Sequence, residues 1–453
     1  MRLNRLVVWI TLAALVGAML ACNLPGQVPE EPSEEEVATV VAETMAVEDE
    51  QKAVTQPTVP QATATPLPTP TDLPKILKLV YTDEGRDLWR YVEGDTVVKL
   101  VDTGDVLDAQ ISDDGTMVAF VRSSDYLHFS LWVVDFAGGD LRELVSEAEF
   151  AGMKNDADAV GVEPYVYQWF PGERALAFVT SPTFEGPGLF VNDDLWRVDA
   201  VNGDLNQLLA PGQGGVFYFS PEGDQIALVT PSSISVADKD GQNRRELFQY
   251  DPILTYSEYR YYAVPKWMPD GKALRVSIPP VDALGDDDRP TLNWQIAVDG
   301  SGVNMLGEIY TVPLGSVDFS PDRTRIAYFK EVGEPSENLR ALHVAKLDGS
   351  EDIVYHTAKQ IDFGGWAPDS KRFVFSFGKS EDAQLGEPGR GFYPLTDVGG
   401  EKGVNWLDED TFIFLAVKNG KWGIYIGQPG GQGTLIDVLG KVDSFFPTYS
   451  FNY

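Results

Sequence analysis

The chain has 453 residues, with 69 Asp and Glu against 35 Lys and Arg, which gives a formal net charge of −34 at pH 7. A balance this acidic argues against binding DNA or RNA through the phosphates, because that requires clustered basic side chains. The single cysteine excludes an intrachain disulfide and a zinc site built from several cysteines, while 43% hydrophobic residues suffice for a large core.

The first 22 residues have the features of an export signal. A basic start with Arg2 and Arg5 precedes an apolar run from Leu6 to Leu20, and Ala21 and Cys22 follow. A positive region, an apolar stretch and a small residue before a break are typical of a cleaved signal peptide rather than a membrane-spanning helix.

The position of the cysteine makes this segment resemble a bacterial lipoprotein signal, in which the cysteine becomes the lipidated N-terminus. Met19 and Leu20 depart from that pattern, which prefers Leu and then a small residue. The resemblance implies a signal peptide over 1–21 and acyl chains on Cys22 that hold the chain on the extracytoplasmic side of the bacterial cell membrane. The alternative is an ordinary secretory signal or an N-terminal anchor.

Residues 22–74 are predicted to be a disordered tether, acidic at first and then rich in Pro and Thr. Ser33–Glu36 has the form of a helix capping box, which predicts one short helix at most. From Thr55 onward Pro recurs every few residues, and Pro fixes φ and removes a hydrogen-bond donor. We therefore expect a polyproline-like spacer of about 60 Å before a folded domain over 75–453.

From residue 75 onward two motifs alternate. One is an aromatic residue, a variable residue, Pro and an acidic residue before an apolar strand; its clearest copies begin at Phe219, Trp267, Phe319 and Trp366. The other is an apolar strand that ends in Asp and Gly, as in Ile234–Gly241. Pro presets φ for a turn and Gly takes its left-handed position, so each motif joins two antiparallel strands. The Pro turns recur about every 47 to 52 residues, which predicts four short strands per repeat.

These motifs resemble the TolB-type, WD40-like β-propeller repeats of bacterial cell-envelope proteins, over roughly residues 75–453. We predict an all-β propeller of four-stranded antiparallel blades, eight in number. Seven is the alternative, because the unit 361–398 shows no clear outer strand. The first unit, Ile76–Val101, lacks an inner strand, so we expect the C-terminal strand to complete it and close the ring. TolB has an additional α/β domain before its propeller, so its partners are not carried over to this chain.

The predicted insertions all fall on one face of such a propeller. Loops between the second and third strands of a blade, and loops between blades, emerge on the same side. The insertions are Ser146–Pro164, Ser181–Asp194, Gln249–Pro265, Pro279–Thr291, Glu331–Leu339 and Ser380–Gly391. Long loops on one side of a rigid scaffold are typical of a binding surface.

An aromatic cluster on that face is the candidate ligand site. Amphipathic rings beside charged residues suit a peptide or a sugar, because they combine stacking area with a hydrogen-bonding tip. The candidate residues are Tyr256, Tyr259, Tyr261, Tyr262 and Trp267. The alternative is that the tyrosines only hold their loop against the blades.

A run of three acids is the candidate metal site. Asp286, Asp287 and Asp288 are hard oxygen ligands that could hold Ca²⁺. Their spacing matches no EF-hand loop, so a solvated acidic loop is the alternative. No other cofactor is expected.

No known catalytic motif is present in the sequence, neither a Gly-x-Ser-x-Gly elbow nor a His-Glu-x-x-His pair. We therefore predict a monomeric, lipid-anchored lipoprotein whose propeller binds an envelope or extracellular protein or glycan without catalysis. One alternative is a propeller lyase or hydrolase that uses His128 or His356 at the channel mouth. The other is a purely structural envelope protein.

Overall fold

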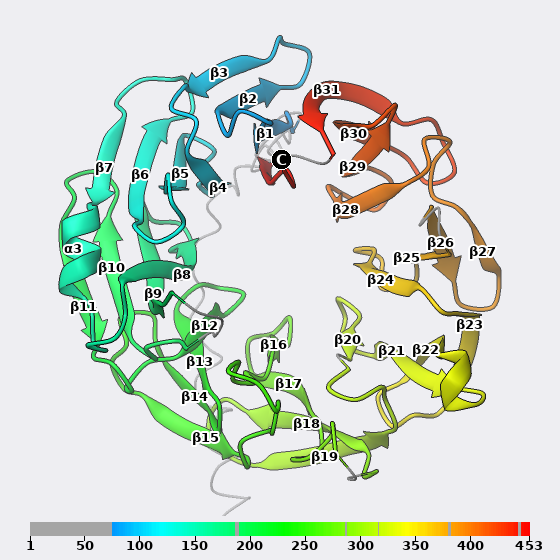
Figure 1. Ribbon diagram of the computed structural model, residues 1–453. Coiled ribbons are helices and arrows are strands. Elements are labelled where there is room, and N and C mark those ends of the chain that lie inside the picture. Colours follow the sequence, from blue (N-terminus) through cyan, green and yellow to red (C-terminus); the bar gives the residue numbers. More distant parts are fainter. Residues whose placement is uncertain (1–74, 186–189, 286–287, 316, 379–381, 443–444) are drawn as a thin grey trace, which may run out of the picture. The chain divides into compact units, whose positions relative to one another are not determined.

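The computed structural model describes residues 75–453 except 186–189, 286–287, 316, 379–381 and 443–444. Within these residues, 32 strands form eight four-stranded antiparallel sheets. The sheets follow one another around a central axis (Figure 1). The unit Pro74–Tyr453 is therefore an eight-bladed β-propeller, which confirms the predicted fold and excludes the seven-bladed alternative.

Blades 1 to 4 each run from an inner to an outer strand. Their strands are β32 (Tyr449–Asn452), β1 (Lys78–Thr82), β2 (Leu88–Val92) and β3 (Val98–Val101) in blade 1; β4 (Val106–Ile111), β5 (Met117–Arg122), β6 (Ser130–Asp135) and β7 (Arg142–Val145) in blade 2; β8 (Gly161–Trp169), β9 (Ala175–Thr183), β10 (Leu195–Asp199) and β11 (Leu205–Leu209) in blade 3; and β12 (Val216–Phe219), β13 (Gln225–Thr230), β14 (Ser233–Asp238) and β15 (Arg245–Gln249) in blade 4.

Blades 5 to 8 repeat this order. Their strands are β16 (Lys266–Trp267), β17 (Ala273–Ile278), β18 (Thr291–Ala297) and β19 (Val303–Ile309) in blade 5; β20 (Asp318–Phe319), β21 (Arg325–Val332), β22 (Leu339–Lys346) and β23 (Ile353–Ala358) in blade 6; β24 (Ile361–Trp366), β25 (Phe373–Phe377), β26 (Ala383–Glu387) and β27 (Gly391–Pro394) in blade 7; and β28 (Glu401–Trp406), β29 (Phe412–Lys418), β30 (Lys421–Gly427) and β31 (Thr434–Lys441) in blade 8. Two short helices are described, α3 (Glu147–Gly152) and the 3₁₀ turn η1 (Pro335–Glu337).

The second strand of several blades is apolar on both faces, because it lies between the first and third strands of its own sheet and is covered by both neighbouring blades. In β5, five consecutive residues from Met117 to Val121 are buried, and β13 and β29 show the same pattern. The buried residues form clusters that extend from one blade to the next. Stacking around the axis thus buries the surface that a single blade would leave exposed.

The outer strand that the sequence did not reveal in blade 7 is β27. All four of its residues, Gly391–Pro394, are exposed, and β27 pairs with β26 through Leu385 and Tyr393 among others. An exposed edge strand needs no alternation of apolar and polar residues. This is why the repeat pattern was weak there.

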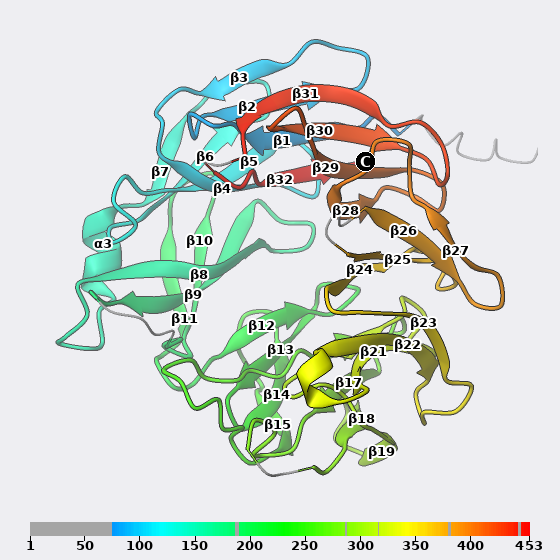
Figure 2. The ribbon, with the colours of Figure 1, turned by 45° about the vertical axis from the view of Figure 1, so that its right-hand side comes forward.

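The C-terminal strand closes the ring as predicted. β32 pairs antiparallel with β1, from Lys78 opposite Asn452 to Tyr81 opposite Tyr449. Figure 2 shows the seam between blades 1 and 8, where β1, β32, β29 and β30 lie side by side. Their apolar residues share one core cluster, which includes Leu79 and Ile413.

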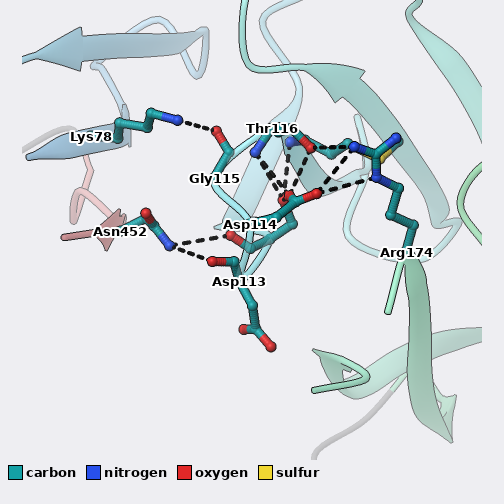
Figure 3. Close-up of polar contacts among 9 residues, drawn as sticks. Lys78, Asp113, Asp114, Gly115, Thr116, Arg174 and Asn452 are labelled. Carbon is teal, nitrogen blue, oxygen red and sulfur yellow. Dashed lines mark hydrogen bonds and ion pairs between the residues drawn. The ribbon is translucent and has the colours of Figure 1, made fainter. Parts of the chain in front are cut away.

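Polar contacts extend this closure to blades 2 and 3 (Figure 3). The Asn452 amide donates to Asp113 O at 2.9 Å, and Lys78 Nζ donates to Gly115 O at 2.8 Å. In the same turn of blade 2, Asp114 accepts from Arg174 Nε of blade 3 at 3.2 Å. Blades 1, 2 and 3 are thereby linked at the face that carries the short turns.

Candidate functional site

The strand order places two kinds of connection at one end of the propeller. In every blade, the loop between the second and third strands and the loop to the next blade both lie opposite the Pro-Asp-Gly turns. We call this end the long-loop face and the other the short-turn face. The four longest connections lie on the long-loop face: 146–160, 184–194, 250–265 and 279–290.

The prediction of a long loop over Ser380–Gly391 is wrong for about half of that segment. Ala383–Glu387 forms β26, and Gly391 begins β27. Ala383, Leu385 and Gly386 of β26 are buried, while Gln384 and Glu387 are half-buried. A strand this short, with Gly and two polar residues among five, lacks the apolar pattern from which the other strands were predicted.

A cavity of about 700 Å³ lies on the long-loop face and is lined largely by the segment 250–265. We call it the tyrosine cavity, because Tyr256, Tyr259 and Tyr261 line it. A second hollow of about 570 Å³ adjoins it and shares four lining residues: Ser232, Ser233, Glu246 and Pro252. Ligand pockets in proteins have volumes of roughly 300 to 1,000 Å³, so each hollow has room for a small molecule or part of a chain.

Three tyrosines attach the segment 250–265 to the blades. The hydroxyl of Tyr250 donates to Thr230 O at 2.7 Å, and that of Tyr261 to Ser277 O at 3.4 Å. The hydroxyl of Tyr262 donates to Asp193 Oδ1 at 3.2 Å. Burial raises the pKa of Tyr250 to about 12 and raises the pKa values of Tyr261 and Tyr262 as well. These side chains hold the wall of the cavity in place.

The other two tyrosines are available to a ligand. Tyr256 is 71% exposed and Tyr259 is 51% exposed. The Tyr256 hydroxyl donates to Asp282 Oδ1 at 2.7 Å, which joins the segment 250–265 to the loop 279–290. The predicted aromatic cluster therefore divides into rings that support the loop and rings that face solvent beside the cavity.

Trp267 lies elsewhere. It is in the inner strand β16, only 6% exposed, and its indole Nε1 donates to Tyr218 O at 3.0 Å. It packs among the buried apolar residues of blades 4 and 5 and is not among the residues that line the tyrosine cavity.

Four charged residues also line the cavity, and three of them come from outside the segment 250–265. They are Asp193 from the loop 184–194, Arg244 from the turn before β15, Glu246 in β15, and Arg260 from the segment 250–265. Asp193 and its partner Tyr262 are 69 positions apart. The only signal for Asp193 was that it belongs to a predicted insertion.

Asp193 is a half-buried carboxylate, with no salt-bridge partner among the described residues. Burial raises the pKa of Asp193 to about 6, against the opposing effects of the Tyr262 hydrogen bond and of Arg260. Its backbone has a φ of 51°, which a non-glycine residue rarely adopts. The next residue, Asp194, is buried and fixes this loop to the blade.

The raised pKa of Asp193 predicts a pH-dependent stability difference. A carboxyl that titrates near 6 in the folded chain and near 4 in the unfolded chain costs stability as pH rises through this window. Asp193→Asn removes that cost, so we expect the variant to gain on the order of 1 kcal/mol relative to wild type between pH 4 and pH 7, allowing for partial exposure. Urea unfolding of both proteins at the two pH values measures the change, and a constant difference would contradict the expectation.

The predicted metal site falls partly outside the described residues. Asp286 and Asp287 lie there, while Asp288 is exposed and lines a cavity of about 390 Å³ between the loop 279–290 and the connection 310–317. Among the residues that the structure describes, no group of three or more His, Cys, Asp and Glu side chains could hold a metal ion. The Ca²⁺ prediction thus stays a prediction.

The two histidines of the enzyme alternative lie in different blades. His128 is exposed in the loop between β5 and β6, and its Nδ1 is 2.7 Å from Asp125, which raises the pKa of His128. His356 is in the outer strand β23 and stacks on Phe377 with ring centroids 3.7 Å apart. An outer strand is distant from the central channel, so His356 does not take the place that the enzyme alternative requires.

Cys22 and the tether lie outside the described residues. In the part of the chain that the structure describes, no helix has the length and apolar character needed to cross a membrane.

No family model matches this chain, and no curated protein matches it. Solved structures that resemble it include a eukaryotic initiation factor, with 8% sequence identity and a TM-score of 0.51 over 83% of this chain and 98% of that chain. They also include TolB from Acinetobacter baumannii, with 15% identity and a TM-score of 0.32 over 62% of this chain.

A third likeness is to the β-propeller domain of the trilobed protease from Pyrococcus furiosus, with 12% identity and a TM-score of 0.44 over 74% of this chain and 98% of that chain. The match to TolB spans 63% of the TolB chain. At 8% identity, the likeness to the initiation factor shows a shared fold and nothing about activity.

Proposed function

We propose that this chain is a membrane-anchored, extracytoplasmic lipoprotein whose propeller binds an envelope or extracellular protein or glycan without catalysis. The observation that supports it most is the tyrosine cavity, where the exposed rings of Tyr256 and Tyr259 stand beside Asp193, Arg244 and Arg260. Rigid aromatic rings next to a few charged groups are typical of recognition sites for peptides and sugars.

The rigidity of the cavity wall also supports a binding role. Tyr250 and Tyr262 hold the segment 250–265 by buried hydroxyls, so little conformational entropy would be lost when a ligand binds. The exposed rings thus stand on a scaffold that is already ordered. The anchor on Cys22 and the tether before residue 75 would present this face at a distance from the membrane.

The double variant Tyr256→Ala/Tyr259→Ala is expected to lose most partner binding while it remains folded, because both rings are exposed. Truncation of exposed anchor rings typically costs about 1 to 2 kcal/mol each, which is tenfold or more in affinity for the pair. The measurement is crosslinked capture from the cell envelope together with a glycan array, with wild type and variant side by side. Protein capture and array binding distinguish the two classes of partner.

The matched control is Tyr126→Ala. Tyr126 is a 60% exposed tyrosine on the same face, in the loop between β5 and β6, and it is not among the residues that line the cavity. Equal binding by wild type and the double variant would refute a role for this cavity.

In a separate experiment, Cys22→Ser should release the protein from the membrane fraction if Cys22 is lipidated.

A further inference from the structure

Five basic side chains gather between blades 5 and 6, in a chain that is acidic overall. Lys266 in β16 and Arg275 in β17 come from blade 5, and Arg323, Arg325 and Lys346 come from blade 6. A cavity of about 390 Å³, which we call the blade 5–6 cavity, lies at this junction on the short-turn face. Arg275, Arg325 and Lys346 line it.

Among the described residues, one neutral side chain, that of Gln295, accepts the hydrogen bonds of the Arg275 guanidinium. Its Nε and Nη2 both donate to Gln295 Oε1, at 3.3 and 3.1 Å. Its Nη1 is buried and has no acceptor among the described residues. Burial lowers the pKa of Arg275, against the attraction of Asp322, which raises it. A half-buried guanidinium with no carboxylate directly bonded to it is costly, and an anionic ligand at Nη1 would reduce that cost.

The neighbouring cations do not help to balance it. Arg323 donates to the carbonyls of Trp267 and Ser320, at 3.1 and 2.7 Å, rather than to an acid. Burial lowers the pKa of Arg323 and Arg275 lowers it further, against the attraction of Asp322. Desolvation and Arg323 likewise lower the pKa of Lys266, against the effect of Asp318. Like charges thus face one another across the junction of the two blades.

The nearby acids are already engaged. Asp322 accepts from the hydroxyls of Ser320 and Thr324 at 2.7 and 2.9 Å and from Thr324 N at 3.0 Å. It forms no ion pair within 4 Å among the described residues. Its carboxylate thus completes its own turn and attracts Arg275, Arg323 and Arg325 without a direct ion pair.

The two remaining cations share one acid. Arg325 and Lys346 both pair with Glu351, at 3.5 and 2.5 Å. Asp348 is the one acid that lines the blade 5–6 cavity, opposite three cations. The lining therefore has an excess of positive charge.

We propose that the blade 5–6 cavity binds a small ligand that carries an oxyanion group, a carboxylate, phosphate or sulfate, close to Arg275, Arg325 and Lys346. Guanidinium groups suit such oxyanions, because their planar donors match two oxygens at once. The volume exceeds that of a lone ion, since a water molecule takes roughly 30 Å³. Leu306 and Leu347 also line the cavity and would contact an apolar part of the ligand.

This site is on the opposite face from the tyrosine cavity and does not depend on the function proposed above. The test is titration of the full-length, detergent-solubilised chain with sodium phosphate, sulfate and acetate. Ionic strength is kept constant with NaCl, because general screening would otherwise mimic binding. The readout is the shift of the thermal unfolding midpoint, which reports affinity through linkage.

Wild type is expected to be stabilised beyond the NaCl baseline. A response to phosphate or sulfate identifies a phosphorylated or sulfated ligand, and a response to acetate alone identifies a carboxylate ligand. Arg275→Gln should weaken the affinity at least tenfold, and Arg275→Lys should retain part of it. No shift beyond NaCl in wild type, or the same shift in Arg275→Gln, would overturn the proposal.

Two further variants distinguish a loss of ligand binding from unfolding and from a general effect of removing positive charge. Lys346 is exposed, so Lys346→Gln should fold normally and weaken the affinity severalfold. Arg390→Gln removes a charge in blade 7 that is 77% exposed and paired with Glu387. It should leave the affinity unchanged, and an effect equal to that of Arg275→Gln would also overturn the proposal.

Discussion

A chain shortened by residues 449–453 is expected to lose about 4 kcal/mol or more of unfolding free energy, because the ring can no longer close. Without β32, the inner edge of β1 is unpaired from Lys78 to Tyr81, and blade 1 has only three strands. Urea unfolding followed by circular dichroism and tryptophan fluorescence measures the loss. Coincident midpoints for the shortened and full-length chains would contradict it.

The size of this effect follows from the number of blades that β32 joins. In blade 8, the Asn405 amide donates to the Tyr449 hydroxyl at 2.6 Å, and that hydroxyl lies 3.2 Å from Ile413 O. In blade 2, Ile111 N donates to Ser450 Oγ at 3.2 Å, and Asn452 reaches the turn shown in Figure 3. One short strand thus links three blades.

Two controls separate closure from simple shortening. Removal of Tyr453 alone keeps β32 intact and should change the stability by less than about 0.5 kcal/mol. A peptide with the sequence of residues 445–453, added to the shortened chain, should restore part of the stability by pairing with β1.

Asp194→Ala is expected to destabilise the propeller by about 3 kcal/mol, because it leaves three donors without this acceptor, two of them fully buried. Asp194 is 1% exposed. It accepts from Thr180 N at 2.8 Å, from the Thr180 hydroxyl at 2.6 Å and from Trp196 Nε1 at 2.8 Å. Chemical denaturation measures the loss. Asp204→Ala, which removes an exposed carboxylate in a turn of the same blade, should change stability by less than about 0.5 kcal/mol.

The substitution Asp194→Ala should also impair the tyrosine cavity. Asp194 holds the end of the loop 184–194, and the preceding residue, Asp193, lines the cavity and binds the Tyr262 hydroxyl. Asp194→Ala is therefore expected to reduce partner binding even where the variant is still folded. Full binding together with the stability loss would show that this loop does not position the site.

The repeat and its closure could be predicted because each depends on local chemistry that recurs. In blade 6, Ser320 Oγ donates to Asp322 and accepts from Arg325 N at 2.9 Å, so a few residues close their own turn. In blade 4, Gly223 takes a φ of 72°, as the turn requires. Turn residues of this kind determine where strands begin, and their period determined the blade count.

The candidate site could be predicted only in outline. The sequence predicted that the site lies on the long-loop face and that Tyr256 and Tyr259 belong to it. It did not predict which tyrosines support the loop and which face solvent, nor the burial of Trp267, because neighbouring aromatic residues in a sequence do not reveal which of them are exposed. The strands β26 and β27 were missed for a related reason, since a short strand with Gly and polar residues, or one that is exposed throughout, lacks the apolar pattern.

The sequence by itself therefore determined the architecture of this protein, an all-β propeller built from a repeated four-stranded unit and closed by its last strand. Turn chemistry and strand periodicity are local, and they act within one blade. Only the tertiary structure decided which residues share a site. Asp193 meets Tyr262 across two blades, and Arg275 meets Arg325 and Lys346 across another junction, because stacking around the axis brings together residues that are tens of positions apart.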